Sequence, residues 1–329
     1  MLVSLNCKVT IEQPGKTLQF TALNHCEIEK SIYILGSKAK IKIPASCRLI
    51  VQGRETDSVQ TAKQFNRGYK ITICLGYNDD IQQEFTGFIY RINYTTPLEI
   101  ECEGYEYLLR SQLGKKTWGA TTLKEVVEYI CNVSGISLSD NIPGINLTNY
   151  VIKVGLSRLE ALQELKEKYG LVAYFVDNSL YIGTAYTPDL GSVNYSLGVN
   201  TIKDDQLKYH DADDVKLKVK AIGISGNNTM VEADIGDQDG QLRTLFFYNI
   251  TSMDVLKKVA NEELQKYKYS GFEGKITAFL QPWAQPGMKA VLTDPVYKER
   301  SGTYYIVSTK VEFGRSGARR IVEIDIKLQ

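Results

Sequence analysis

Acidic residues form the clusters in this sequence that most readily suggest chemistry. They gather at Asp204-Asp205, at Asp211, Asp213 and Asp214, and in the stretch DIGDQDG at 234–240. Carboxylate oxygens are ligands that Ca²⁺ prefers, and the order of residues from Asp237 to Gly240 is similar to the middle of an EF-hand loop. Ile235 and Phe246, however, stand where such a loop needs its first and last ligands. We therefore interpret Asp239-Gly240 as a hairpin turn and expect no metal site.

Other residues that could do chemistry are sparse. The two histidines, His25 and His210, lie far apart and have no neighbouring Cys/His cluster of zinc-site spacing. The sequence contains no nucleophile elbow, zinc-protease motif, phosphate loop or dinucleotide fingerprint. Paired carboxylates of the glycosidase kind stay open, because the fold alone sets their separation. We expect a protein without enzymatic activity, with no catalytic, cofactor-binding or metal-binding residues and no cofactor.

The cysteines point to reduced, buried thiols. All six fall in the first 131 residues without a C-x-x-C pair, at positions 7, 26, 47, 74, 102 and 131. Cys74 and Cys102 lie within alternating apolar runs, where free thiols pack as small hydrophobic groups. This usage is typical of a protein made in the cytosol.

Composition excludes several partner classes. Lys plus Arg at 39 nearly cancels Asp plus Glu at 38, so no overall field attracts nucleic acid or anionic lipid. No run approaches eighteen apolar residues, and the N-terminus lacks the basic start and apolar middle of a signal peptide. We expect no specific nucleic-acid partner and no membrane anchor.

The chain divides into three segments by periodicity. Residues 1–104 and 185–329 alternate with period two and predict antiparallel β domains, the second interrupted by one helix that starts near Thr251. Residues 105–184 predict an α+β insert, with helices opened by capping boxes at Thr122 and Ser157 and a hairpin around Asp177. The fold class is therefore mainly β, α+β overall, with two tube-like antiparallel β-barrels flanking a small α+β insert.

The two β segments share an organisation. GYKITICLGY, EFTGFIYRINY and LEIECEG follow one another in the first, and GMKAVLTD, TYYIVSTKVEF and RRIVEIDIKL in the second. We interpret the succession as an internal repeat. Gly87 lies inside the strand EFTGFIYRIN, between Phe85 and Ile89 on one face. A glycine there favours a bulge or bend that curls the sheet, so Gly87 is a structural candidate.

The order and spacing of these runs resemble the baseplate hub proteins of contractile phage tails, the late control protein D family. They are also similar to the hub half of type VI secretion spike proteins. The quoted strands, the runs TLKEVVEYIC and LSRLEALQELKEKYGLVAYFVDNSLYIG, and the closing strands carry this resemblance over nearly the whole chain.

The resemblance implies a structural hub of three copies. Two similar barrels in each of three chains would form a pseudo-sixfold ring that joins a sixfold tail tube to a threefold spike. The implied partners are further copies of this chain, a spike protein, a tail tube protein and other baseplate proteins. The implied location is the bacterial cytoplasm during assembly and then the tail baseplate or injection apparatus. Some relatives continue into a spike or a lysozyme; because this sequence stops after a strand, we expect another chain to supply them.

Two alternatives stay open from the residues. A receptor-binding or carbohydrate-binding β-protein at a tail tip would use exposed aromatic residues, and Trp118 and Trp283 are the candidates. A tail-associated hydrolase would need carboxylates that meet only in the fold.

Overall fold

The computed structural model describes residues 4–48, 50–51, 54–55, 57–225, 229–298 and 301–328. Among the helices of these residues, none is both long and apolar enough to cross a membrane.

The first β region, residues 5–103, forms from seven long strands that alternate buried apolar and exposed polar side chains. In β4 the buried residues are Ala39, Ile41 and Ile43, while the lysines between them face the other way. The long strands are β1 Leu5–Gln13, β2 Lys16–Phe20, β3 His25–Ser31, β4 Lys38–Ile43, β9 Lys70–Tyr77, β10 Asp80–Asn93 and β11 Leu98–Glu103. The short strands β5 Ser46–Cys47, β6 Ile50–Val51, β7 Arg54–Glu55 and β8 Val59–Gln60 precede η1 Thr61–Gln64.

The α+β region, residues 105–183, begins each helix as the sequence predicts. Thr122 accepts from the backbone of Glu125 and Ser157 from that of Glu160, and both glutamates reach back, so both capping boxes are confirmed. Gly170 ends the second helix with a φ of 58°. The elements are η2 Tyr105–Arg110, β12 Lys116–Thr122, α1 Leu123–Ile130, β13 Ser137–Leu138, β14 Asn146–Ile152, α2 Arg158–Lys168, β15 Val172–Val176 and β16 Ser179–Gly183.

The second β region encloses its own apolar core, which includes Tyr195, Ile276 and Val322. Its elements are β17 Ser192–Ser196, β18 Thr201–His210, η3 Ala212–Asp214, β22 Gly271–Ala278, β23 Lys289–Thr293, β24 Gly302–Gly314 and β25 Gly317–Leu328.

A separate three-stranded sheet with one helix interrupts this region. It consists of β19 Leu217–Ile224, β20 Met230–Gly236, β21 Gln241–Tyr248 and α3 Met253–Tyr267. β19 lies in the middle, antiparallel to β20 and parallel to β21. The interpretation of Asp239-Gly240 as a hairpin turn is therefore wrong, because the strands that this turn joins lie on either side of β19 and do not pair with each other.

The mainly β class is confirmed, but the strands do not form two separate closed barrels in the described residues. One sheet runs in the order β18-β22-β25-β24-β3-β4-β11-β10-β9-β1-β2, with β17 and β23 attached through β24. The physical reason is a difference in length. β24 has 13 residues and β23 only five, so β23 pairs with the first part of β24 and leaves the rest of that edge to β3. The domain limits at 104 and 184 stay a prediction.

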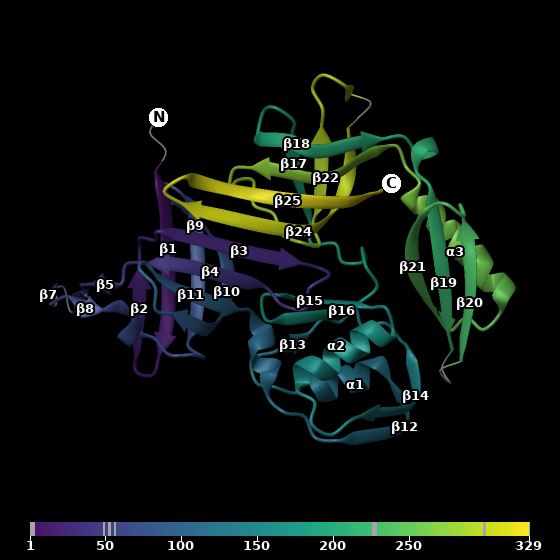
Figure 1. Cartoon of the computed structure of the whole chain (residues 1–329), viewed down its shortest axis with the longest axis horizontal. Helices are drawn as coiled ribbons and strands as arrows, with labels where there is room; N and C mark the ends of the chain where they lie inside the picture. Colours follow the sequence, from purple (N-terminus) through teal and green to yellow (C-terminus); the bar gives the residue numbers. More distant parts are fainter. Residues whose placement is uncertain are drawn as a thin grey trace.

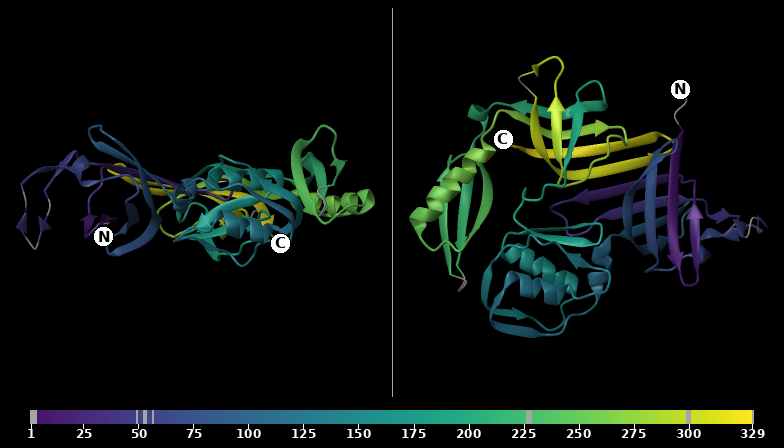
Figure 2. Two further views of the ribbon diagram at one scale, coloured as in Figure 1. Left: turned by 90° about the horizontal axis from the view of Figure 1, so that it is seen from below. Right: turned by 180° about the vertical axis from the view of Figure 1, so that it is seen from behind.

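The internal repeat appears in the strand pairing. β9, β10 and β11 form an antiparallel meander, and β23, β24 and β25 form another. Figure 1 shows the two β regions side by side, joined where β3 lies next to β24, with the α+β region below them and the α3 sheet at one end. The views in Figure 2 show that the whole chain is elongated and thin.

Candidate assembly site

The residues that the sequence singled out for chemistry do not meet. Within the described part of the chain, no group of three or more His, Cys, Asp or Glu residues could hold a metal ion. His25 lies 3.9 Å from Glu27 at the start of β3, and the ring of His210 is tilted by 57° against that of Tyr269, with ring centres 4.9 Å apart. Each histidine therefore has a local structural neighbour instead of a second metal ligand.

The acidic clusters have structural contacts. Asp237 accepts hydrogen bonds from the Leu217 backbone at 3.0 Å and from Lys268 at 2.7 Å, which ties the β20–β21 turn to β19 and to the end of α3. Asp211, Asp213 and Asp214 are exposed around η3. The side chains of Asp204 and Asp205 lie outside the described residues.

Neither tryptophan presents an open aromatic platform. Trp118 lies on β12, half-buried between Tyr129 and Tyr150. Trp283 is half-buried against the core of the second β region. Both pack against a core and are only partly exposed.

The cysteines are free thiols in the structure. Cys7, Cys26, Cys102 and Cys131 are buried, and burial raises the pKa of Cys131 to about 12. A thiol with such a pKa is neutral and unreactive at neutral pH.

Gly87 lies where the backbones of β10 and β11 come closest. A Cβ atom on Gly87 would be 2.1 Å from the carbonyl oxygen of Glu103 and 2.7 Å from the Phe85 ring. The irregularities of β10 flank Gly87, between Gln83 and Phe85 and between Ile89 and Arg91. The structure thus gives this glycine a close-contact role between two bulges, and a bend of the sheet at Gly87 stays a prediction.

A buried ion pair joins the two β regions, and sequence patterns gave no sign of it. The bulge after Gln83 turns Glu84 into the core, where both of its oxygens accept from Arg320 of β25 at 3.1 and 2.6 Å. Arg320 also donates to the backbone oxygens of Leu280 and Ala284. The side chains are only 3% and 1% exposed, so the guanidinium group replaces its lost hydration with protein acceptors.

A second buried carboxyl group lies between the first β region and the α+β region. Glu106 on η2 accepts from the backbone of Gly104 at 2.9 Å through one oxygen, while its other oxygen is buried without a partner. Gly36 and Gly104 leave the space that this carboxyl group fills, because a Cβ atom on either would collide with it. Burial raises the pKa of Glu106 to about 8, so the folded chain holds it protonated at neutral pH.

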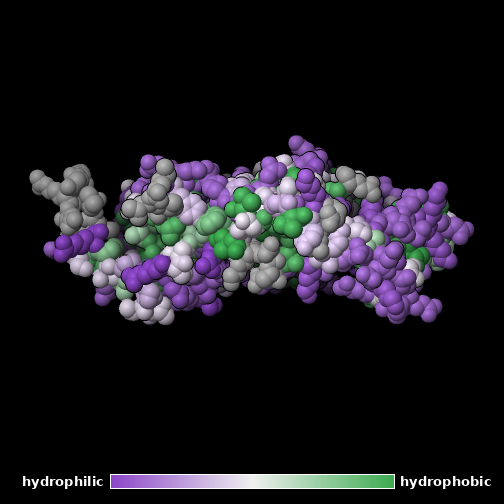
Figure 3. Space-filling model, turned by 90° about the horizontal axis from the view of Figure 1, so that it is seen from above, coloured by the Kyte–Doolittle hydropathy of each residue, from purple (hydrophilic) through white to green (hydrophobic). Residues whose placement is uncertain are grey.

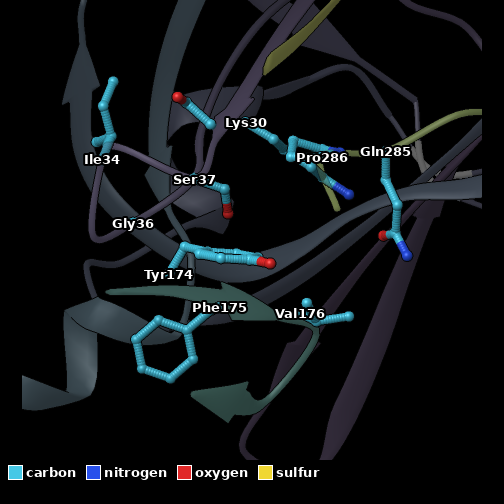
Figure 4. A pocket seen from close by; sticks show the side chains of 10 residues that line it. Lys30, Ile34, Gly36, Ser37, Tyr174, Phe175, Val176, Gln285 and Pro286 are labelled. Carbon is cyan, nitrogen blue, oxygen red and sulfur yellow. The ribbon is translucent and has the colours of Figure 1, made fainter. Parts of the chain in front are cut away.

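Three parts of the chain enclose a small pocket of about 10 Å³ near this point. Figure 4 shows Lys30 from β3, Tyr174 from β15 and Gln285 from the loop before β23 around it. The volume suits about one water molecule, which is too small for a substrate. Burial lowers the pKa of Lys30.

Asp325 of β25 joins four segments of the chain. Its side chain accepts from Tyr33 at 3.2 Å and Tyr186 at 2.6 Å and lies 3.6 Å from Arg243, while its backbone oxygen accepts from Tyr269 at 2.7 Å. These partners come from the loop after β3, the segment after β16, β21 and the segment after α3. The buried polar groups of this chain therefore hold its parts together, and the candidate site is a site of assembly.

Comparisons with known proteins identify the fold. No protein-family model matches the sequence, and a search of curated proteins gives no significant match. Solved structures do match. The tail protein of Neisseria meningitidis MC58 has a TM-score of 0.62 at 14% identity, over 98% of this chain and 97% of that one. The match to phage tail proteins extends over nearly the whole chain.

Two further structures support the same fold. The 43 kDa tail protein of prophage MuSo2 from Shewanella oneidensis has a TM-score of 0.60 at 16% identity, over 98% and 97% of the two chains. An Escherichia coli component of the type VI secretion system, described as similar in structure to the bacteriophage T4 tail proteins gp27 and gp5, has a TM-score of 0.56 at 9% identity. That match covers all of this chain and 77% of the other.

We predict that Gly87→Val lowers the free energy of unfolding, because the new side chain must displace the backbone of β11 at Glu103. Chemical denaturation of the purified variant measures the loss. Gly119→Val is a matched control, since Gly119 also lies in a strand region but has nothing within 4 Å of its Cβ position. Equal stability of the two variants would contradict the close-contact role.

We predict that Arg320→Met costs about 3–5 kcal/mol, because it leaves Glu84 charged and buried without its partner. The double variant Glu84→Leu/Arg320→Met should lose less than the sum of the single losses, as denaturation in a double-mutant cycle would measure. Strictly additive losses would show that the two side chains do not interact.

We predict that Glu106 makes stability depend on pH. Its folded pKa of about 8 exceeds the ordinary 4.5, so its contribution is fully present below about pH 4.5 and declines as pH rises towards 8. Glu106→Gln should therefore match the wild type near pH 4.5 and be more stable than it at pH 8. Denaturation curves at both pH values test this, and an unchanged pH slope would contradict it.

Proposed function

We propose that this chain is a structural hub protein of a contractile phage tail or a related injection apparatus. Three copies would form a pseudo-sixfold ring that joins a sixfold tail tube to a threefold spike. The observation that carries the proposal is the fusion of two similar β meanders into one sheet through β3 and β24. Two similar units per chain are what a threefold assembly needs in order to match a sixfold partner.

Each β region is proposed as one barrel-like unit of that ring. One core lies around Ile41, Ile71 and Ile100 and the other around Tyr195, Ile276 and Ile306, and the first also takes in residues of β24 and β25, namely Val311, Phe313 and Ala318. Edges left unpaired within one chain would be completed by the neighbouring copies. The likeness to tail proteins over nearly the whole chain supports this arrangement.

The charged face of the sheet is the proposed lining of the ring's channel. β3 presents Glu27 and Glu29, β4 presents Lys38, Lys40 and Lys42, and β11 presents Glu99, Glu101 and Glu103. On this face, strands that carry acidic side chains lie next to strands that carry lysines. Lys310 of β24 lies 2.9 Å from Glu27 and 3.4 Å from Glu29, and Lys42 lies 3.4 Å from Glu99. Such a lining is polar but nearly neutral, which reduces retention of either acidic or basic cargo.

The proposed partners are a spike protein, a tail tube protein and other baseplate proteins, in addition to further copies of this chain. The proposed location is the bacterial cytoplasm during assembly and the tail baseplate afterwards. We propose no enzymatic role, because the residues with catalytic potential are dispersed among structural contacts.

We predict that the purified chain forms a particle of three times its 37.0 kDa mass when alone at high concentration, or a particle with three copies of the chain plus the spike when mixed with its cognate spike protein. Light scattering coupled to size-exclusion chromatography measures this. A strict monomer in both conditions would overturn the hub proposal.

A further inference from the structure

The contact between β24 and β3 shows how one β region attaches to the next. β24 pairs with β25 along one edge. Its other edge is shared, with β23 on Gly302–Tyr305 and β3 on Ser308–Gly314. The start of β3 lies at the tip of the β24–β25 turn, since His25 pairs with Gly314. β3 is thus a terminal strand of one region that extends the sheet of the other.

β10, the counterpart of β24 in the first meander, pairs along more of the corresponding edge and leaves only its last residues, 90–93, for a further partner. Its other edge pairs with β9 from Asp80 to Phe88, and Ile89 then bonds to the backbones of Gly68 and Tyr69. Beyond Ile89, the described strands give this edge no partner. A groove of about 280 Å³ lies there, lined by Phe65, Asn66, Arg67, Tyr90, Arg91, Ile92 and Tyr94.

β18, the counterpart of β3 in the second region, is a strand with one edge free to pair. It is the last strand of the sheet and pairs, among the described strands, with β22 alone. Its ten residues are long enough to pair with the free part of β10. β2, at the opposite end of the sheet, has only five residues and is the poorer extension strand.

Exposed apolar side chains lie at the ends that such a pairing would bring together. Tyr94, directly after the tip of β10, is 81% exposed. Val199, two residues before β18, is 72% exposed, and Phe279, directly after the partner of Thr201 on β22, is 49% exposed. Figure 3 shows apolar surface in the middle of the face seen from above, over the second β region.

The turn that carries Val199 is ordered by its own hydrogen bonds. Asn200 accepts from the backbone of Ser196 and donates to the backbone oxygen of Asn194, and the backbone of Val199 donates to Ser196. The chain therefore holds the Val199 side chain out to solvent in a turn of fixed shape.

We propose that β18 of one copy pairs antiparallel with the free part of β10 in the next copy, so that Tyr94 lies against Val199 and Phe279 of its neighbour. This inference rests on the hub proposal and names the contact between copies. The groove beside β10 is the place of the incoming strand. The contact is heterologous, and it repeats between chains what β3 and β24 do within one chain, so successive copies can close a ring.

Disulfide cross-linking tests the contact. In a Cys47→Ser/Cys74→Ser background, which removes the two half-exposed thiols, Tyr94→Cys and Val199→Cys chains are co-expressed with different tags and oxidised. We expect a disulfide-linked pair that contains both tags, because a disulfide requires the two Cα atoms to come within about 7 Å. Either variant alone should give no such product. Tyr94→Cys with Val154→Cys is the control, since Val154 is 78% exposed but lies in the α+β region.

Light scattering gives a second readout. Val199→Asp should lose the trimer, while the matched Val154→Asp should keep it. A trimer that forms without the cross-link from Tyr94→Cys to Val199→Cys, or that survives Val199→Asp, would overturn this contact and leave the hub proposal standing. A strict monomer, also with the spike protein, would overturn both.

Discussion

The backbone ladder between β3 and β24 is the contact on which the rest of this structure depends. It exists because β24 is longer than β23, so about half of the β24 edge that faces β23 has no partner within its own meander. An exposed edge of that length attracts another strand, and here the chain supplies one from residues that are nearly three hundred positions away. Through this ladder the strands of the two β regions form one continuous sheet.

The buried polar groups follow from that fusion. Four strands separate β10 from β25 in the order of the sheet, yet the bulge in β10 directs Glu84 towards Arg320 of β25. A buried ion pair adds little stability over apolar packing, but it penalises any arrangement that separates its members. Tyr77 adds to the same junction by donating to the Ala318 backbone and accepting from Leu280. These contacts fix how the two β regions meet.

Much of the fold follows from local patterns. The parts that local patterns did not predict depend on pairing between strands that are distant in the sequence. Alternation identified the strands, and the hydroxyl-to-glutamate spacing at Thr122 and Ser157 placed two helices correctly. The continuous sheet was missed because a two-residue period says nothing about which strand occupies an edge. The order β20-β19-β21 was missed for the same reason, since a turn at Asp239 fits both a hairpin and a crossover. Glu84 gave no signal, because a bulge changes which face a residue occupies.

The difference between the two meanders bears on assembly more than their likeness does. If β24 and β10 each had a partner strand within the chain, neither strand would leave an edge for another copy. Here β3 pairs with β24, whereas the end of β10 lies beside a groove. Covalent connection guarantees the first contact at any concentration, while a contact between copies depends on how many copies are present. In the proposed ring, one seam per chain would therefore be permanent, and the other would form only when enough copies are present.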